Sequence, residues 1–174
     1  LMQTPTHFLL TAFLNRTLPG HDKAVHTGAL LFGAVLPDLP ITVLTLVSEL
    51  YYRWFASLPT DGTVMEYLHF TLFFTDPFWI VSHNFFHSLV INALLLTIGG
   101  CGWLRRRRWG FFLFWLAISL LFHTVIDIAT HHSDGPLFLF PLNWTYRFAS
   151  SISYWEADYH GRTFTVFEYT LNAL

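Results

Sequence analysis

The chain has 174 residues, of which 53% are hydrophobic, 19% are aromatic and only 11% are charged, with a net charge of −2 at pH 7. Soluble domains carry about 25% charged residues, so this composition excludes an ordinary water-exposed surface and favours burial in a lipid bilayer. The charge balance gives no case for nucleic-acid binding, and the one cysteine, Cys101, excludes an intrachain disulfide.

The N-terminal part of the chain predicts a helical hairpin. Thr4-Pro5 is typical of a helix start, with Thr as the N-cap and Pro in the first turn. A helix over residues 4–15 and a second apolar segment over residues 23–36 are both too short to cross about 30 Å of hydrocarbon comfortably. We therefore expect a hairpin that lies partly in the membrane, with Arg16 and Lys23 near its tip.

The middle of the chain alternates apolar segments with breaks. Pro37-Asp38-Leu39-Pro40 interrupts the helical pattern, residues 41–55 are apolar, and residues 57–63 form a polar loop. Residues 65–79 are rich in aromatic side chains and are interrupted at Asp76-Pro77. This segment is either a membrane span or a helix at the interface.

The clearest predicted spans are residues 85–104 and 109–130, joined by Arg105-Arg106-Arg107-Arg108. Four arginines in a short connection predict a cytoplasmic turn, which places both free ends of this hairpin on the other side of the membrane. A polar loop, residues 131–136, and an aromatic tail, residues 137–174, follow. We expect a cap on the membrane surface there.

These elements together predict an all-α fold. We expect one membrane-embedded domain over residues 1–174, with a helical bundle over residues 1–130 and the loop and cap over residues 131–174. The bundle would consist of two helical hairpins plus the intervening helices, crossing the membrane several times in contact with the lipid bilayer.

His123 and Asp127 form the sharpest candidate site. They are four residues apart near the end of an apolar segment, so they share one helix face. Ionisable groups inside membrane segments are costly and mark functional sites by default, and imidazole and carboxylate are both ligands for zinc. A buried His–Asp hydrogen bond that only fixes the helix explains this pair equally well.

Three further residues are expected at the same depth. His87 lies about 20 residues before the middle of the arginine turn and Asp127 about 20 residues after it, so an antiparallel hairpin brings them level. His7 and Asp38 lie at the ends of the first hairpin that are farthest from its basic tip. Five polar ligands at one level of an apolar bundle would be expensive to bury without a cation.

Other titratable residues have two readings each. His83 precedes His87 by one helical turn, and His131 and His132 follow Asp127 closely. Each of these histidines is interpreted either as an extra metal ligand or substrate contact, or as an ordinary residue of a loop or of the entrance to a span. His160 and Glu168 in the tail are expected to be surface residues.

The order of these motifs resembles the YdjM-like family, bacterial inner-membrane proteins described as candidate metal-dependent hydrolases. The matching residues here are His7, Pro37-Asp38, His87-Ser88 and His123-Thr124-Val125-Ile126-Asp127, followed by Thr130, Gly135 and Pro141. Two positions depart from the family pattern: Pro40 replaces a second acid, and Ser82 stands where a histidine is usual. The His-x-x-x-Asp motif is also loosely similar to the zinc-dependent phospholipase C group.

The resemblance implies a membrane-bound metal-dependent hydrolase of the bacterial inner membrane. A divalent metal, zinc by expectation, would be held by His7, Asp38, His87, His123 and Asp127 or a subset of them, with Asp38 or Asp127 as general base. A lipid or other phosphoester at the interface is the expected substrate. The alternative is a non-catalytic accessory subunit of a larger membrane complex, with a structural His/Asp or metal cluster.

Overall fold

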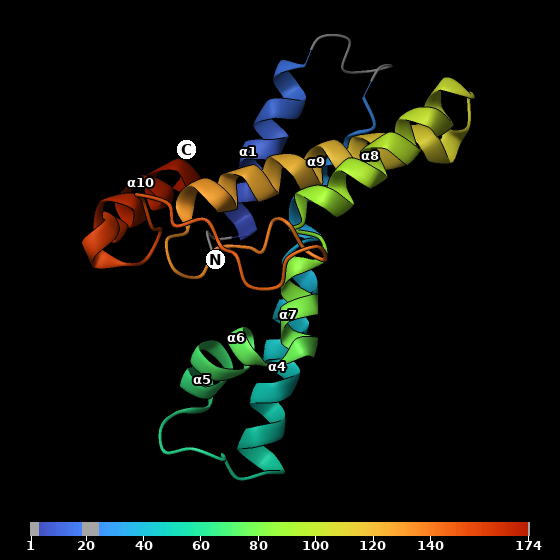
Figure 1. Ribbon diagram of the computed structural model, residues 1–174. Coiled ribbons are helices and arrows are strands. Elements are labelled where there is room, and N and C mark those ends of the chain that lie inside the picture. The colour runs from blue at the N-terminus through green and yellow to red at the C-terminus, as the bar shows by residue number, and fades with distance from the viewer. Residues whose placement is uncertain (1–3, 19–24, 174) are drawn as a thin grey trace.

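The computed structural model describes residues 4–18 and 25–173, and within these ranges all regular structure is helical (Figure 1). The predicted all-α class is therefore confirmed for this part of the chain. The elements are α1 (Thr4–Thr17), α3 (Thr27–Val35), α4 (Leu39–Trp54), α5 (Val64–Glu66), a π-helical turn (Tyr67–Leu72), α6 (Phe73–Thr75), α7 (Pro77–Asn84), α8 (Leu89–Leu104), α9 (Arg108–Thr130), a 3₁₀ turn (Ala157–Tyr159) and α10 (Gly161–Ala173).

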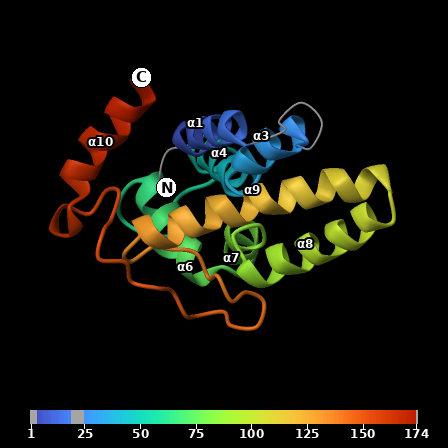
Figure 2. The same cartoon turned by 90° about the horizontal axis from the view of Figure 1, so that it is seen from above.

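The antiparallel pair of α8 and α9 forms the longest packed unit of the fold (Figures 1 and 2). The helices approach closely near the arginine turn because glycines face each other there. A Cβ atom on Gly110 would overlap the backbone of Gly102, and one on Gly99 would lie 2.5 Å from the backbone nitrogen of Phe114. Small residues allow such close contact between membrane helices.

Two breaks bend the chain at positions that matter for function. The pair α3–α4 bends by 41° and the pair α7–α8 by 46°. Pro40 occupies the first turn of α4, where its missing N–H costs nothing, and Ser88 caps α8 by accepting a hydrogen bond from the Ile91 N–H at 3.1 Å. The predicted straight helix over residues 85–104 therefore starts four residues later, at Leu89.

The predicted segment over residues 65–79 is divided rather than continuous. Val64–Glu66, the π-helical turn and α6 form its first part, and α7 begins at Pro77. Asp76 separates them, and its side chain accepts hydrogen bonds from Phe78 N at 2.9 Å and Trp79 N at 3.1 Å. The expected break at Asp76-Pro77 is thus an N-cap followed by a helix-starting proline.

By length and composition, α9 is the one helix of the described residues that qualifies alone as a membrane span. Each bent pair qualifies only if its two helices are counted as one span. Figure 1 shows that α4 and α7, with α5 and α6, extend away from the α8–α9 hairpin on the side opposite to α1. The intervening helices form a second arm, and the expected bundle of two hairpins plus the intervening helices is not confirmed.

The first hairpin packs along α9 through α3, and the C-terminal segment follows the end of α9. Helices α1 and α3 contact each other, and α3 lies against α9. Arg16 is in the last turn of α1, while Lys23, the other residue expected at this tip, lies outside the described residues. Residues 131–156 run irregularly past the end of α9, and α10 contacts α1 (Figure 2).

Candidate metal centre

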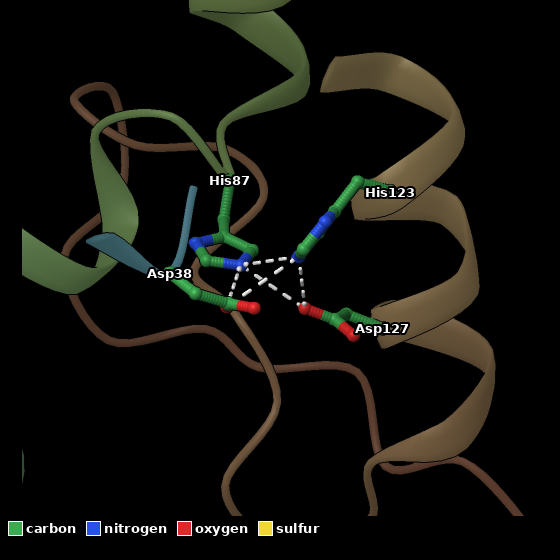
Figure 3. A group of neighbouring side chains, drawn as sticks. All are labelled: Asp38, His87, His123 and Asp127. Carbon is green, nitrogen blue, oxygen red and sulfur yellow. Dashed lines mark hydrogen bonds and ion pairs between the residues drawn. The ribbon is translucent and has the colours of Figure 1, made fainter. Parts of the chain in front are cut away.

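Four predicted ligands meet where the two bends face α9 (Figure 3). Asp38 lies in the turn between α3 and α4, and His87 lies in the break between α7 and α8. His123 and Asp127 project from one face of α9, one turn apart. One ligand atom from each of the four lies within 4.8 Å of the others, and none of the four residues is more than 1% exposed.

The donor atoms are spaced like the corners of a metal coordination shell. The two imidazole Nε2 atoms of His87 and His123 are 3.2 Å apart. Asp127 Oδ2 lies 3.0 Å from His87 Nε2 and 3.3 Å from His123 Nε2, and Asp38 Oδ1 lies 3.6 and 3.5 Å from the same two atoms. Ligand bonds of 2.0–2.1 Å in a tetrahedral site separate donors by roughly 3.3–3.4 Å.

Backbone contacts fix which ring nitrogens face the centre. His87 Nδ1 lies 2.6 Å from the carbonyl oxygen of His83, and His123 Nδ1 lies 2.9 Å from that of Ala34. A carbonyl oxygen only accepts, so each Nδ1 must carry a proton and donate it. In the neutral rings both Nε2 lone pairs then point at each other and at two carboxylates, which is the tautomer that metal ligands adopt.

Unpartnered atoms in the same place support the fit of a cation. Asp38 Oδ1 and Asp127 Oδ2, the two oxygens that face the imidazole Nε2 atoms, are buried and accept no hydrogen bond. Buried polar atoms are nearly always satisfied, so such a group requires an explanation. A divalent ion placed among the two carboxylates and the two Nε2 atoms would satisfy all of these ligand atoms together. The residues present therefore fit a zinc-like ion.

His7 approaches the centre from α1 but lies outside the group of four. Its ring stacks on that of His123, with centroids 3.7 Å apart, and its Nε2 is 3.0 Å from Asp127 Oδ1. Asp127 Oδ1 is not the oxygen that faces the two Nε2 atoms. The structure thus brings all five predicted residues together, with four around one point and His7 on the outer oxygen of Asp127.

His131 flanks the same outer oxygen. Its Nδ1 lies 2.8 Å from the Asp127 carbonyl oxygen and 3.9 Å from Asp127 Oδ1, while its Nε2 is buried without a hydrogen-bond partner. Burial lowers the pKa of His131 below its usual value. Of the two readings left open for this residue, a position beside the centre is the one observed.

The remaining histidines and Glu168 take different positions. His83 is buried and its ring lies 4.6 Å from that of His87, so it is not an entrance residue. His132 stacks on Tyr159 away from the four ligands, and His160 is exposed. Glu168 is buried rather than at the surface, because its Oε1 accepts a hydrogen bond from Thr6 Oγ1 at 2.8 Å.

Several supporting residues were not found by sequence reasoning. Thr4 donates from Oγ1 to Asp38 Oδ2 at 2.7 Å. Asn92 donates to the Phe86 carbonyl oxygen at 2.9 Å and to Thr124 Oγ1 at 3.2 Å, which ties the α7–α8 break to α9. Asn84 Oδ1 accepts from Leu137 N at 2.6 Å. Polar side chains within apolar segments were the available signal for the two asparagines.

Comparison with known protein families gives one match. The family described as YdjM inner membrane protein matches residues 2–172, which is nearly the whole chain. The searches of curated proteins and of solved structures found no match. The match agrees with the order of the His and Asp motifs and with the apolar composition. The chain belongs to the YdjM inner membrane protein family.

Proposed function

We propose that this protein is a membrane-bound metal-dependent hydrolase. The observation that carries the proposal is the convergence of Asp38, His87, His123 and Asp127, with donor atoms within 4.8 Å of one another. The four come from three separate parts of the chain, and the two histidines present their Nε2 lone pairs to the same point. Packing alone does not require two carboxylates and two such lone pairs to meet.

The types of donor favour a catalytic over a purely structural zinc site. Structural zinc sites are mostly built from cysteines, whereas catalytic sites use histidines and carboxylates. The one cysteine, Cys101, is exposed near the arginine turn and takes no part in this centre. Histidine and aspartate also suit other divalent ions of the first transition series, so zinc is proposed on the strength of its common use.

Asp127 is the better placed of the two proposed general bases. Its Oδ2 faces the imidazoles, while its Oδ1 lies beside His7 Nε2 at 3.0 Å. The Oδ1 atom can accept a proton, and the nearby His7 Nε2 can orient the carboxylate. Asp38 has less freedom because its Oδ2 already accepts a hydrogen bond from Thr4. A divalent ion held by the four residues would supply Lewis acidity toward a scissile phosphoester and toward water.

Membership of an inner membrane family supports a substrate found at the membrane. We propose a lipid or another phosphoester, since zinc-like ions with carboxylate bases serve the hydrolysis of such bonds. The test measures release of head groups from phospholipid vesicles by purified, zinc-loaded protein. Asp127→Asn should lower the rate at least about 100-fold, because it removes both a ligand charge and the base.

A matched control is available in the exposed His160, whose backbone is left-handed with φ 67°. Asn tolerates this conformation, so His160→Asn removes an imidazole without backbone strain and should keep full activity. His7→Ala should lower kcat with little effect on KM, because His7 contacts Asp127 and His123 and orients them rather than the substrate. Equal rates for wild type and Asp127→Asn would contradict the proposal.

The burial of the centre favours a second candidate function. With none of the four residues more than 1% exposed, the ion would be enclosed as in a structural site. In that case the protein is a non-catalytic subunit of a larger membrane complex. Stoichiometric metal that stabilises the fold, together with no turnover on any phosphoester vesicle tested, would support this candidate and contradict hydrolysis.

A further inference from the structure

A cavity of about 250 Å³ lies between α4, the π-helical turn, α6 and α7. Its walls are mostly apolar, with Ile41, Leu68, Phe73 and Trp79 among them. Asp134, from the loop that follows α9, also lines it. The cavity shares elements with the metal centre: Asp38 immediately precedes α4, and Asp134 follows His131 by three residues.

Asp134 brings a buried carboxylate to this apolar cavity. The residue is 4% exposed, and its Oδ2 accepts hydrogen bonds from Trp155 Nε1 at 3.1 Å and from the Tyr154 hydroxyl at 3.4 Å. Its Oδ1 is buried and has no hydrogen-bond donor. A buried carboxylate oxygen without a partner costs free energy, and the cost is relieved by a ligand that donates to it.

No basic side chain of residues 4–18 and 25–173 forms an ion pair with Asp134. The charge of Asp134 acts on Arg147, but the Arg147 guanidinium donates to the Gly135 carbonyl oxygen and lies over the rings of Phe73 and Phe74, 5.3 and 5.2 Å from their centroids. His69 lines the cavity, and burial lowers its pKa more than the charge of Asp134 raises it, which disfavours a charged imidazole there. The carboxylate therefore has room for a cation from outside the chain.

The walls favour an organic cation over a bare metal ion. Trp79 brings to the wall an aromatic ring of the kind that attracts alkylammonium groups, and the aliphatic side chains match the carbon atoms of such a group. An inorganic divalent ion would need several oxygen ligands, and the cavity offers one carboxylate and the hydroxyls of Thr42 and Thr45. We propose that this cavity binds the ammonium group of an amine-bearing phospholipid head group, with Asp134 as its counter-ion.

This inference rests on the proposed function, because it names the substrate class: an aminoalkyl phosphoester lipid presented beside the metal centre. A lipid is the expected source of the amine because the chain belongs to an inner membrane family. Binding and hydrolysis can nevertheless be measured separately. Selective binding without turnover would keep the inference and end the hydrolase proposal, and turnover without selectivity for the amine would overturn the inference alone.

The test compares two lipids that differ in one charge. Phosphatidylethanolamine with a fluorescent acyl chain, and the same lipid with its amine acetylated, are titrated into zinc-loaded protein in neutral maltoside micelles. The wild-type protein should bind the amine lipid at least about tenfold more tightly, a difference of about 1.4 kcal/mol. Equal affinity for the two lipids in the folded wild-type protein would overturn the proposal without any variant.

Two variants sharpen this test. Asp134→Asn keeps an oxygen that accepts from Trp155 and removes the charge, so it should abolish the preference for the amine lipid. Thr45→Phe fills the cavity from α4 and should weaken binding of the amine lipid, whereas His160→Asn should leave it unchanged. Free ethanolamine at the concentration of the lipid should not compete. Full displacement by it would contradict a lipid as the ligand.

Discussion

The polar side chains at the two ends of the α8–α9 hairpin differ in their burial and in their contacts with one another. At the turn, the four arginines are all exposed, and none forms an ion pair with a carboxylate of the described residues. At the other end, His87, His123 and Asp127 are buried with donor atoms about 3 Å apart. Exposed guanidiniums need no partner because water or lipid head groups solvate them, whereas the buried ligand atoms at the other end face one another and fit a cation between them.

The backbone packing differs between the two ends as well. At the turn, the glycines allow the helices to touch without intervening side chains, as the contact of Gly110 with Gly102 illustrates. Near the centre, side chains separate the elements, and Asn92 ties the α7–α8 break to α9 through Thr124. Close backbone contact therefore closes one end of the hairpin, and polar side chains that support the proposed metal organise the other.

The largest expected effect is the stabilisation by zinc. An ion that binds the folded chain alone adds about 4 kcal/mol to the free energy of unfolding at 1,000 times its Kd. Asp127→Asn should remove most of this gain, because it replaces a charged ligand. Thermal unfolding in detergent with and without a chelator measures the effect. An identical response to zinc in wild type and Asp127→Asn would show that the ion binds elsewhere.

Gly110→Leu should destabilise the end of the α8–α9 hairpin that lies at the arginine turn. Its side chain would overlap the backbone of Gly102 and Trp103, so we expect a loss of about 1–3 kcal/mol in the free energy of unfolding. Gly100→Leu is the matched control, because a Cβ there meets only a side-chain atom of Phe114 at 3.7 Å. Unfolding titrations of both variants, each saturated with zinc, test this. Equal losses would contradict the importance of the glycine contact.

Thr4→Val should weaken zinc binding at the centre without removing a metal ligand. It deletes the hydrogen bond from Thr4 Oγ1 to Asp38 Oδ2 at 2.7 Å. Loss of a partner that orients a metal ligand typically lowers metal affinity about 10–100-fold. Competition with a fluorescent zinc chelator measures the change in Kd. An unchanged Kd in the folded variant would indicate that Asp38 is held by the α3–α4 turn alone.

Single arginine substitutions should have the smallest effect. Arg105→Gln changes an exposed residue, so we expect less than about 0.5 kcal/mol in the free energy of unfolding and no change in zinc affinity. The same unfolding and chelator measurements provide the check. A large change in zinc affinity would mean that the two ends of the hairpin are coupled, contrary to the contrast drawn above.

The elements of this fold followed from local patterns, but their directions did not. The apolar run after the arginines predicted α9, and proline with capping residues predicted the breaks near Pro40 and Asp76. The break before Leu89 was missed although Ser88 caps α8 locally, and the bonds of Asn84 to Leu137 and of Asn92 to Thr124 are distant in sequence. The second arm of α4 and α7 was missed because the local patterns gave no direction to the bends of 41° and 46° that start it.

The candidate site could also be predicted from the sequence only in part. His123 and Asp127 could be predicted as neighbours from helical spacing alone, and His87 from its distance to the arginine turn. The position of His7 on the outer oxygen of Asp127 depends on how α1 and α3 pack against α9, which no local pattern encodes. Asp134 drew no attention in the sequence because its loop reads as ordinary polar surface, although the side chain is buried.

The most direct test of the account is the metal content of the purified protein. Protein prepared without immobilised metal, loaded with zinc and dialysed, should contain about one ion per chain by mass spectrometry of the digested sample. His123→Ala and Asp127→Asn should each contain less than about a tenth of that amount, while His160→Asn should keep it all. Background levels of every divalent metal in the folded wild-type protein would contradict the central claim that these residues form a metal centre.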